Sequence, residues 1–436
     1  MRGLRSTLIL LVVLAGLVGY IYYLNRAKPA DTDTKKAFAK LNADDIEELR
    51  IKSADNQTTR LQKTNGHWQI VEPVKAEAAD TDVSAIATDL ATLDVDRVVD
   101  ENPGSVKQYG LEPARVQVEF RTKGQKDFRR VDVGDKTATG GDVYARLPGE
   151  KRVVLVNSSL DPAFNKNTFA LREKNILHFD RDKVDGLELT SGASTFAFTR
   201  TAMEWTITKP IMARGEYATL EGVLERLSTA QMQGIVADSA TDLKQYGLDK
   251  PDTTITVHAG GAPVTLSLGH TENALVYAKD STRPLIFTVA PTIKTDTFKD
   301  LSDYRRKDLF DSRSFTATHV EYKRGNETLT FDKTTGKDGK ETWKNAAGKT
   351  IDAAKMEDLL AKTTALRADS YEAAANPALK MPGLVVSVKF GMNRMETVSF
   401  ARQGTDVFAA RADEPGTAKF TGAPMDDVIK ALDAVK

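Results

Sequence analysis

Residues 68–73 read Trp-Gln-Ile-Val-Glu-Pro, and the same Trp-x-Ile-x-x-Pro pattern returns at residues 205–210 as Trp-Thr-Ile-Thr-Lys-Pro. Residues 107–111, Lys-Gln-Tyr-Gly-Leu, are repeated without change at residues 244–248. Both pairs are separated by 137 residues (205 − 68 and 244 − 107). Matching motifs at one common offset indicate an internal duplication, and a duplication decides the fold because each copy forms one structural unit.

A third copy is degenerate. It has Trp343, then Lys-Met-Pro-Gly-Leu at residues 380–384, with a tryptophan-to-glycine spacing of 40 against 42 in the other copies. Val-Tyr-Ala at residues 143–145 and 276–278 corresponds to Val-Phe-Ala at residues 407–409. We therefore predict an anchor and linker over residues 1–36, followed by repeat unit 1 (37–180), repeat unit 2 (181–314) and a degenerate repeat unit 3 (315–436).

Within each unit the hydrophobic pattern alternates between two periods. Alternation with period two predicts strands, in unit 1 over residues 46–51, 58–63, 67–71, 116–120, 130–133, 143–146 and 153–156. Helical spacing predicts an intervening helix with Val83, Ile86, Leu90 and Leu93 on one face and Asp80 or Asp82 as its N-cap. A second helix closes the unit, over residues 162–171 in unit 1 and 424–435 in unit 3. The predicted fold class is α+β, with tandem mixed or antiparallel sheets and packed helices.

The N-terminus predicts a membrane anchor. Residues 6–24 contain no charge, and as a helix these 19 residues would span about 28 Å, close to the hydrocarbon thickness of a bilayer. Tyr20, Tyr22 and Tyr23 stand at one end, where an interfacial aromatic belt is expected. The alternative is a cleaved signal peptide, but bulky tyrosines occupy the place where small residues are needed. We expect a single-pass protein of the cytoplasmic (inner) membrane with its body on the periplasmic side.

The tryptophan motif, the helix, Tyr-Gly-Leu followed closely by Pro113 or Pro251, and the Val-Tyr-Ala strand together resemble a known family. It is the bacterial "domain of unknown function 4340" family, whose members typically carry one N-terminal membrane helix and tandem copies of this unit. The resemblance implies no established activity. It implies a role beside ABC-type export systems related to gliding-motility auxiliary proteins.

Composition and motifs exclude several function classes. The formal net charge is zero, which argues against a nucleic-acid partner, and the absence of cysteine excludes disulfides and thiolate metal sites. The P-loop, the Gly-x-Gly-x-x-Gly fingerprint and Gly-x-Ser-x-Gly are all missing. The five histidines are far apart and never spaced as a His-Glu-x-x-His zinc site. We therefore assign no catalytic, cofactor-binding or metal-binding residue, and we expect a non-enzymatic protein without a cofactor.

The repeated side chains have a structural and a functional interpretation. Trp68, Trp205 and Trp343 are expected to fill the core between sheet and helix, the alternative being a row of aromatics that stack on a ligand. The tyrosines of Tyr-Gly-Leu are expected to be structural as well. The repeated basic pairs Arg172/Lys174 and Arg305/Lys307 are expected to mark charged unit boundaries, the alternative being contact with anionic lipid headgroups.

Three functions remain open at this point. The first is an interaction or scaffold protein that contacts an ABC-transporter or envelope complex through an exposed patch or a sheet edge. The second is a lipid-, glycan- or peptide-binding module with an apolar groove between repeat units. The third is an envelope hydrolase, which requires two acids in one pocket, at least one with a perturbed pKa.

Overall fold

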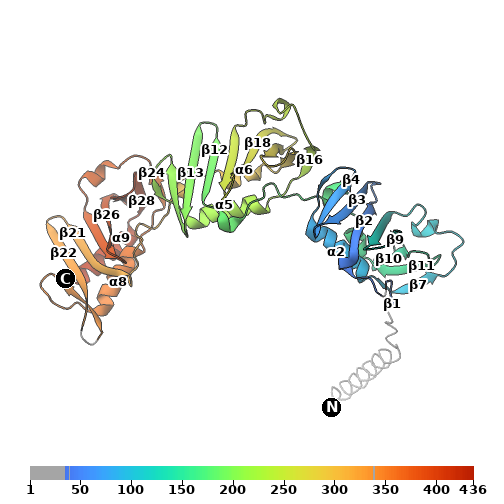
Figure 1. The fold of residues 1–436 in the computed structure, drawn as a ribbon. Helices are drawn as coiled ribbons and strands as arrows, with labels where there is room; N and C mark the ends of the chain where they lie inside the picture. The colour runs from blue at the N-terminus through green and yellow to red at the C-terminus, as the bar shows by residue number, and fades with distance from the viewer. Residues whose placement is uncertain (1–34, 39, 337–338) are drawn as a thin grey trace, which may run out of the picture. The chain divides into compact units, whose positions relative to one another are not determined.

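The computed structural model describes residues 35–38, 40–336 and 339–436 (Figure 1). The chain divides into two compact units, Met1–Lys174 and Asn175–Lys436, and each is described here by itself. The predicted anchor over residues 6–24 lies outside the described residues. Within the part that is described, no helix is long and apolar enough to cross a membrane.

The first unit is built on a nine-stranded sheet in the order β5-β4-β3-β2-β8-β9-β10-β11-β7 (Figure 1). Every pair of neighbouring strands is antiparallel, and β2 and β8 pair at the centre through Leu49 and Phe120. A separate short pairing joins β1 to β6. The strands are β1 (Lys35–Lys36), β2 (Ile46–Lys52), β3 (Thr58–Thr64), β4 (His67–Glu72), β5 (Ala76–Glu77), β6 (Asp94–Val95), β7 (Arg97–Asp100), β8 (Val116–Thr122), β9 (Arg129–Lys136), β10 (Asp142–Arg146) and β11 (Val153–Asn157).

Helices cover this sheet because its inward positions are apolar. Strand β8 alternates buried and half-buried residues, and the helix α2 (Asp80–Ala91) buries Val83, Ile86, Ala87 and Leu90 from a single stripe. These residues join one hydrophobic core with the strand residues. The remaining helical segments are η1 (Ala43–Asp45), η2 (Lys107–Tyr109), α3 (Leu160–Phe164) and α4 (Thr168–Leu171).

The second unit contains two further antiparallel sheets; the first repeats the strand order of the nine-stranded sheet, and the second repeats it without the edge strand that corresponds to β5. The first runs β15-β14-β13-β12-β17-β18-β19-β20-β16 and the second runs β23-β22-β21-β25-β26-β27-β28-β24. The first comprises β12 (Gly186–Ser191), β13 (Ser194–Thr201), β14 (Glu204–Lys209), β15 (Ala213–Arg214), β16 (Gly234–Ala237), β17 (Thr253–His258), β18 (Val264–Glu272), β19 (Leu275–Asp280) and β20 (Ile286–Val289). The second comprises β21 (Ala317–Arg324), β22 (Glu327–Thr335), β23 (Glu341–Asn345), β24 (Ser370–Glu372), β25 (Leu384–Phe390), β26 (Arg394–Gln403), β27 (Asp406–Arg411) and β28 (Thr417–Thr421).

Each of these two sheets has its own hydrophobic core and its own helices. In Figure 1 the helix α5 (Tyr217–Thr229) runs along the face of the first sheet, and α8 (Ala353–Thr364) packs against α9 (Ala423–Ala434) beside the second. The other helical segments are η3 (Arg181–Lys183), η4 (Lys244–Tyr246), α6 (Thr292–Thr297), α7 (Leu301–Tyr304) and η5 (Pro377–Lys380). The α+β architecture predicted from the sequence is confirmed.

The predicted strands of unit 1 agree with the observed ones to within a few residues, and all their pairings are antiparallel. Two expectations were wrong in detail. The closing helix over residues 162–171 is two short helices, α3 and α4. The N-cap of α2 is Ala79, which offers no side-chain hydrogen bond, because the Asp80 carboxylate accepts from the backbone N–H of Trp68 at 2.6 Å instead.

The predicted domain boundaries at residues 36, 180 and 314 remain predictions. Each of the three large sheets lies within one of the predicted ranges. The division into compact units falls between Lys174 and Asn175 and keeps the second and third sheets together.

Candidate functional site

The repeated tryptophans lie in the hydrophobic cores, as expected. Trp68, Trp205 and Trp343 are 2%, 3% and 8% exposed. The Trp205 indole N–H donates to Glu221 at 3.0 Å on helix α5, which ties strand β14 to that helix. Burial of the three rings leaves no stacking face for a ligand, so these side chains are structural.

The Tyr-Gly-Leu motif is a structural turn that meets the Val-Tyr-Ala strand. Gly110 and Gly247 take positive φ angles of 69° and 68°, which glycine adopts without strain. The preceding tyrosines pack on the tyrosines of the strand, Tyr109 on Tyr144 with ring centroids 4.9 Å apart and Tyr246 on Tyr277 at 5.1 Å. Two motifs that lie more than thirty residues apart in each repeat thus form one contact.

Two further glycines contact this turn from a neighbouring strand and were not identified from the sequence. A Cβ atom on Gly134 or Gly269 would overlap the carbonyl oxygen of Tyr109 or Tyr246, respectively. Both glycines lie in the second strand after the turn, β9 or β18. The signal that could have revealed them is their separation of 135 residues (269 − 134), close to the repeat offset.

The third repeat lacks this turn, which corrects one correspondence drawn from the sequence. Gly110 and Gly247 stand six residues before β8 and β17, whereas Gly383 directly precedes β25 and has no positive φ. Pro382 stands at the position matched to the tyrosines, and Met381, matched to Gln108 and Gln245, is 88% exposed. The sequence match of residues 380–384 to Lys-Gln-Tyr-Gly-Leu therefore does not mark an equivalent turn.

Two of the histidines and the arginines of the repeated basic pairs have contacts or burial that favour a structural role. His67 and His319 contact Asp80 and Asp332 at 2.6 and 2.7 Å, and among the described residues no group of three or more potential metal ligands occurs. Arg172 and Arg305 are 9% and 3% exposed. A buried arginine is poorly placed for lipid headgroups, which argues against that alternative for these two arginines, and the unit-boundary interpretation of the basic pairs remains a prediction.

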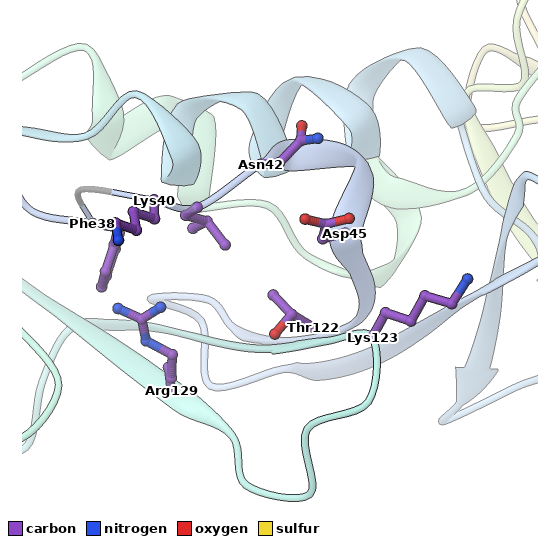
Figure 2. A pocket seen from close by; sticks show the side chains of 8 residues that line it. Phe38, Lys40, Asn42, Asp45, Thr122, Lys123 and Arg129 are labelled. Carbon is purple, nitrogen blue, oxygen red and sulfur yellow. The ribbon is translucent and has the colours of Figure 1, made fainter.

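One cavity of about 590 Å³ lies at the start of the described chain and is called the N-terminal pocket (Figure 2). It is formed by the segment that leads into β2, by the end of β8 and by the start of β9, and its lining comprises Phe38, Lys40, Leu41, Asn42, Asp45, Thr122, Lys123 and Arg129. The segment is held in place by backbone bonds, from Ala37 N–H to the Leu93 carbonyl at 2.7 Å and from Lys123 N–H to the Asp45 carbonyl at 2.8 Å.

The N-terminal pocket carries three cations and one carboxylate. The Arg129 guanidinium lies over the Phe38 ring at 4.3 Å and over Phe120 at 5.2 Å, and Figure 2 shows it pointing toward Phe38. Burial lowers the pKa of Arg129 without bringing it near neutrality. Within the described residues, neither Lys40, Lys123 nor Arg129 forms an ion pair.

A second cavity, of about 400 Å³, lies in the second unit between the second and third sheets and is called the charged pocket. Its lining combines residues of β14, β15 and the start of α5 with residues 306–311, Arg394 and Asp413. Tyr217 and Met203 at its rim are 45% and 74% exposed. Its walls are thus formed by both repeats and are mainly charged.

Behind the charged pocket is a buried set of ion pairs, the junction cluster, made of Arg214, Arg305, Asp311, Glu396, Arg411 and Glu414. Glu414 accepts from Arg214 Nε at 2.5 Å and from Arg305 Nη2 at 3.1 Å. Glu396 accepts from Arg411 at 3.0 Å and from the backbone N–H groups of Asp311 and Ser312 at 2.7 and 2.9 Å. Three arginines and three carboxylates therefore balance across the join between the second and third sheets.

Arginines lower the pKa of two acids in the charged pocket, Asp311 and Asp413. Burial raises the pKa of Asp311, but Arg214, Arg411 and Arg306 outweigh burial and hold that pKa below its ordinary value. The hydrogen bond from Arg411 likewise lowers the pKa of Asp413. Both acids are ionised near neutral pH, so this pair is poorly suited to donate a proton to a leaving group.

Comparisons with known proteins agree with the internal repeats. The sequence model of the family described as "Domain of unknown function (DUF4340)" matches residues 68–240 and again residues 205–382. The two matches begin at Trp68 and Trp205, the tryptophans that define the repeat.

No curated protein matches. Among solved structures, a protein described as a "putative 6-phosphogluconolactonase" from Bacteroides uniformis aligns over 85% of this chain and 83% of its own, at 11% identity and a TM-score of 0.08, a likeness too weak to bear on fold or function. Because the family matches cover most of the chain and start at its repeated tryptophans, this protein belongs to the domain of unknown function 4340 family, with the domain present in tandem.

Proposed function

We propose that this protein is a membrane-anchored, extracytoplasmic, non-enzymatic interaction protein that serves an ABC-type transport or envelope complex. The uncharged stretch over residues 6–24 supports anchoring in the cytoplasmic membrane with the body on the periplasmic side. The tandem sheets support a role in contacting partners because repeated units provide extended surfaces. The lowered pKa values of Asp311 and Asp413 argue against a carboxylate-dependent hydrolase site in the charged pocket, because such a site needs an acid with a raised pKa.

One observation carries the proposal: large apolar side chains are exposed together at one end of the third sheet. Phe315, Met392 and Met395 are 74%, 98% and 59% exposed. The pairings of Ala317 with Phe390 and of Lys389 with Met395 place all three at the same end, which is called the methionine end. Clustered exposed apolar groups mark interaction surfaces, and flexible methionines adapt well to a partner.

Affinity purification tests this proposal directly. The full-length protein is isolated from its native membrane in mild detergent, and the proteins that co-purify are identified by mass spectrometry. The test variant carries Phe315→Ser, Met392→Ser and Met395→Ser. The control is Met381→Ser, because Met381 is 88% exposed on the same repeat but precedes the opposite end of strand β25.

We expect the wild type and the control to recover transporter or envelope subunits in stable proportion, and the triple variant to lose them. Equal recovery with the triple variant would reject the methionine end as the binding surface. Recovery of the wild-type protein alone would reject the interaction function.

The charged pocket supports a second candidate function, a binding module for a charged peptide or glycan. It lies between two repeats, where the groove of such a module is expected, and exposes Tyr217 beside Arg306 and Arg394. Its lining is charged, whereas a lipid groove is mainly apolar. Native mass spectrometry of the purified full-length protein tests it: a bound small molecule that is lost in Arg306→Ala would favour this function, and a bare protein would reject it.

A further inference from the structure

We propose that the N-terminal pocket binds the phosphate group of an anionic phospholipid in the leaflet from which the chain emerges. The proposal rests on the membrane anchoring proposed above and adds to it a site, a ligand class and a residue, Arg129. Three features of the structure support it: the unpaired cations, the contrast with the third repeat, and the place of the pocket in the chain.

The pocket concentrates cations that lack an ion pair, whereas most arginines of the first unit have one. Lys40, Lys123 and Arg129 line one cavity without an ion pair to any described residue, and Asp45 is the single acid in the lining. Other arginines of the same sheet are paired with carboxylates: Arg50 with Glu119, Arg60 and Arg121 with Glu48, Arg115 with Asp161, and Arg130 and Arg146 with Asp132. A guanidinium without a carboxylate partner can form the paired hydrogen bonds that a phosphate accepts.

The third repeat contains the same arginine position in a neutralised form. Arg129 begins β9 opposite Phe120 at the end of β8, and Arg394 begins β26 opposite Phe390 at the end of β25. Each guanidinium lies over its phenylalanine ring, at 5.2 and 4.9 Å. Arg394, however, also reaches the Asp311 carboxylate at 3.5 Å, whereas Arg129 has no such partner in the described chain. The arginine without an acid partner is the one nearer in sequence to the predicted anchor.

If residues 6–24 span the membrane, the linker that follows them keeps the N-terminal pocket near the membrane surface. Strand β1 pairs with β6 and fixes Lys36 two residues before Phe38. The twelve residues from Leu24 to Lys36 span at most about 40 Å even when fully extended. This tether keeps the pocket at a high effective concentration of headgroups, which favours a membrane lipid over a free phosphate as the occupant.

The shape of the pocket fits a headgroup at a membrane surface. Its apolar part is Phe38 and Leu41, and Figure 2 shows Arg129 reaching toward Phe38. Lysine and arginine stems can rest on apolar surface while their charged ends meet phosphates. An anionic lipid would thus supply the negative charge that Asp45, the single acid in the lining, leaves unbalanced.

The experiment uses the full-length chain reconstituted into vesicles of phosphatidylcholine alone or of an equimolar mixture with phosphatidylglycerol. Flotation in phosphatidylcholine reports the anchor by itself, because this lipid has no net charge. The pocket is read separately, from the rates at which Lys40 and Lys123 react with an amine-acetylating reagent, as measured by mass spectrometry. The variants are Arg129→Gln and, as the matched control, Arg394→Gln.

We expect phosphatidylglycerol to slow acetylation of Lys40 and Lys123 in the wild type and in the Arg394→Gln control. In Arg129→Gln this protection should weaken about fivefold, the effect of one cation close to an anionic surface. Labelling of Lys430, exposed on α9, should not depend on the lipid.

The opposite outcomes are distinct. Equal labelling in both kinds of vesicle, or protection that Arg129→Gln leaves unchanged, would overturn the headgroup site. Protection by inorganic phosphate in phosphatidylcholine vesicles, equal to that by phosphatidylglycerol, would also overturn it and assign the pocket to a free anion. Failure to float in phosphatidylcholine would reject the anchor, a result independent of the labelling pattern.

Discussion

Removing the Glu414 carboxylate should destabilise the second unit because it leaves an uncompensated charge in the junction cluster. Its side chain is 6% exposed and that of Arg305 is 4% exposed, so solvent cannot replace the lost partner. Arg305 would keep its bond to the Pro415 carbonyl at 3.0 Å and its position 3.8 Å over the Tyr371 ring, while its Nε atom already lacks a partner. Breaking one partner of a buried ion pair typically costs about 3–5 kcal/mol, and we expect Glu414→Gln to lower the unfolding free energy by that amount.

The assay is native-state hydrogen exchange of the full-length protein in mild detergent, read by mass spectrometry of peptides that cover β15 and β27. Peptides of the first unit provide an internal reference that should not change. The matched control is Asp426→Asn, which breaks the ion pair with Arg402 on the same repeat. Those side chains are 41% and 48% exposed, and an exposed ion pair contributes little to stability.

A second variant separates charge balance from packing. Combining Glu414→Gln with Arg305→Met leaves two cations and two anions in the junction cluster, so part of the lost free energy should return. If Glu414→Gln alone costs no more than Asp426→Asn, or if the double variant shows the full sum of two independent losses, the charge-balance reasoning is wrong.

Three further predictions concern other parts of the chain. Arginines hold the pKa of Asp311 below its ordinary value, so the stability that this ionised group contributes is complete above a pH of about 4 and is lost as the pH falls through the lowered folded-state pKa. In urea titrations at decreasing pH, the unfolding free energy of Asp311→Asn should therefore fall less steeply than that of the wild type. An equally steep fall in both proteins would contradict the assignment. Gly134→Ala should destabilise the first unit by about 1–3 kcal/mol, because the added Cβ overlaps the Tyr109 carbonyl. Gly222→Ala in helix α5, where a Cβ meets no atom within 4 Å, should stabilise the second unit by about 0.5–1 kcal/mol. Thermal unfolding scans measure both changes, and stability changes of the same sign would refute this contrast. Removal of residues 1–24 should yield a soluble body with the circular dichroism of an α+β protein, and aggregation of that body would count against an anchor attached to autonomous domains.

Local patterns in the sequence were sufficient to predict the repeats and the seven longer strands of unit 1, whereas the short strands β1, β5, β6 and β7 were not predicted. Alternation such as that of residues 116–120 reflects one buried face of a sheet, and tertiary context did not override it. Local reasoning failed where a distant group competes for a side chain. Asp80 has the position of a helix cap, yet its carboxylate is held by Trp68 N–H and His67 from the neighbouring strand.

The two pockets could not be predicted from the sequence because their residues come from distant segments of the chain. Phe38 meets Arg129 only because β1 pairs with β6, and Arg214 meets Glu414 across 200 positions. The third repeat shows a related limit: Gly-Leu at residues 383–384 matches the motif by letter, but only the start of β25 shows that the turn is missing. Pairings of this kind depend on sheet order and not on local periodicity.

The central claim is that the methionine end contacts a membrane partner, and site-specific photocrosslinking in the native cell tests it most directly. A photoreactive p-benzoylphenylalanine replaces Met392 in one strain and Met381 in another. The two strains compare two exposed methionines of one repeat: Met392 follows strand β25 and Met381 precedes it. The account predicts an adduct with a transporter or envelope subunit from position 392 and none from position 381. No adduct from position 392, or the same adduct from both positions, would contradict it.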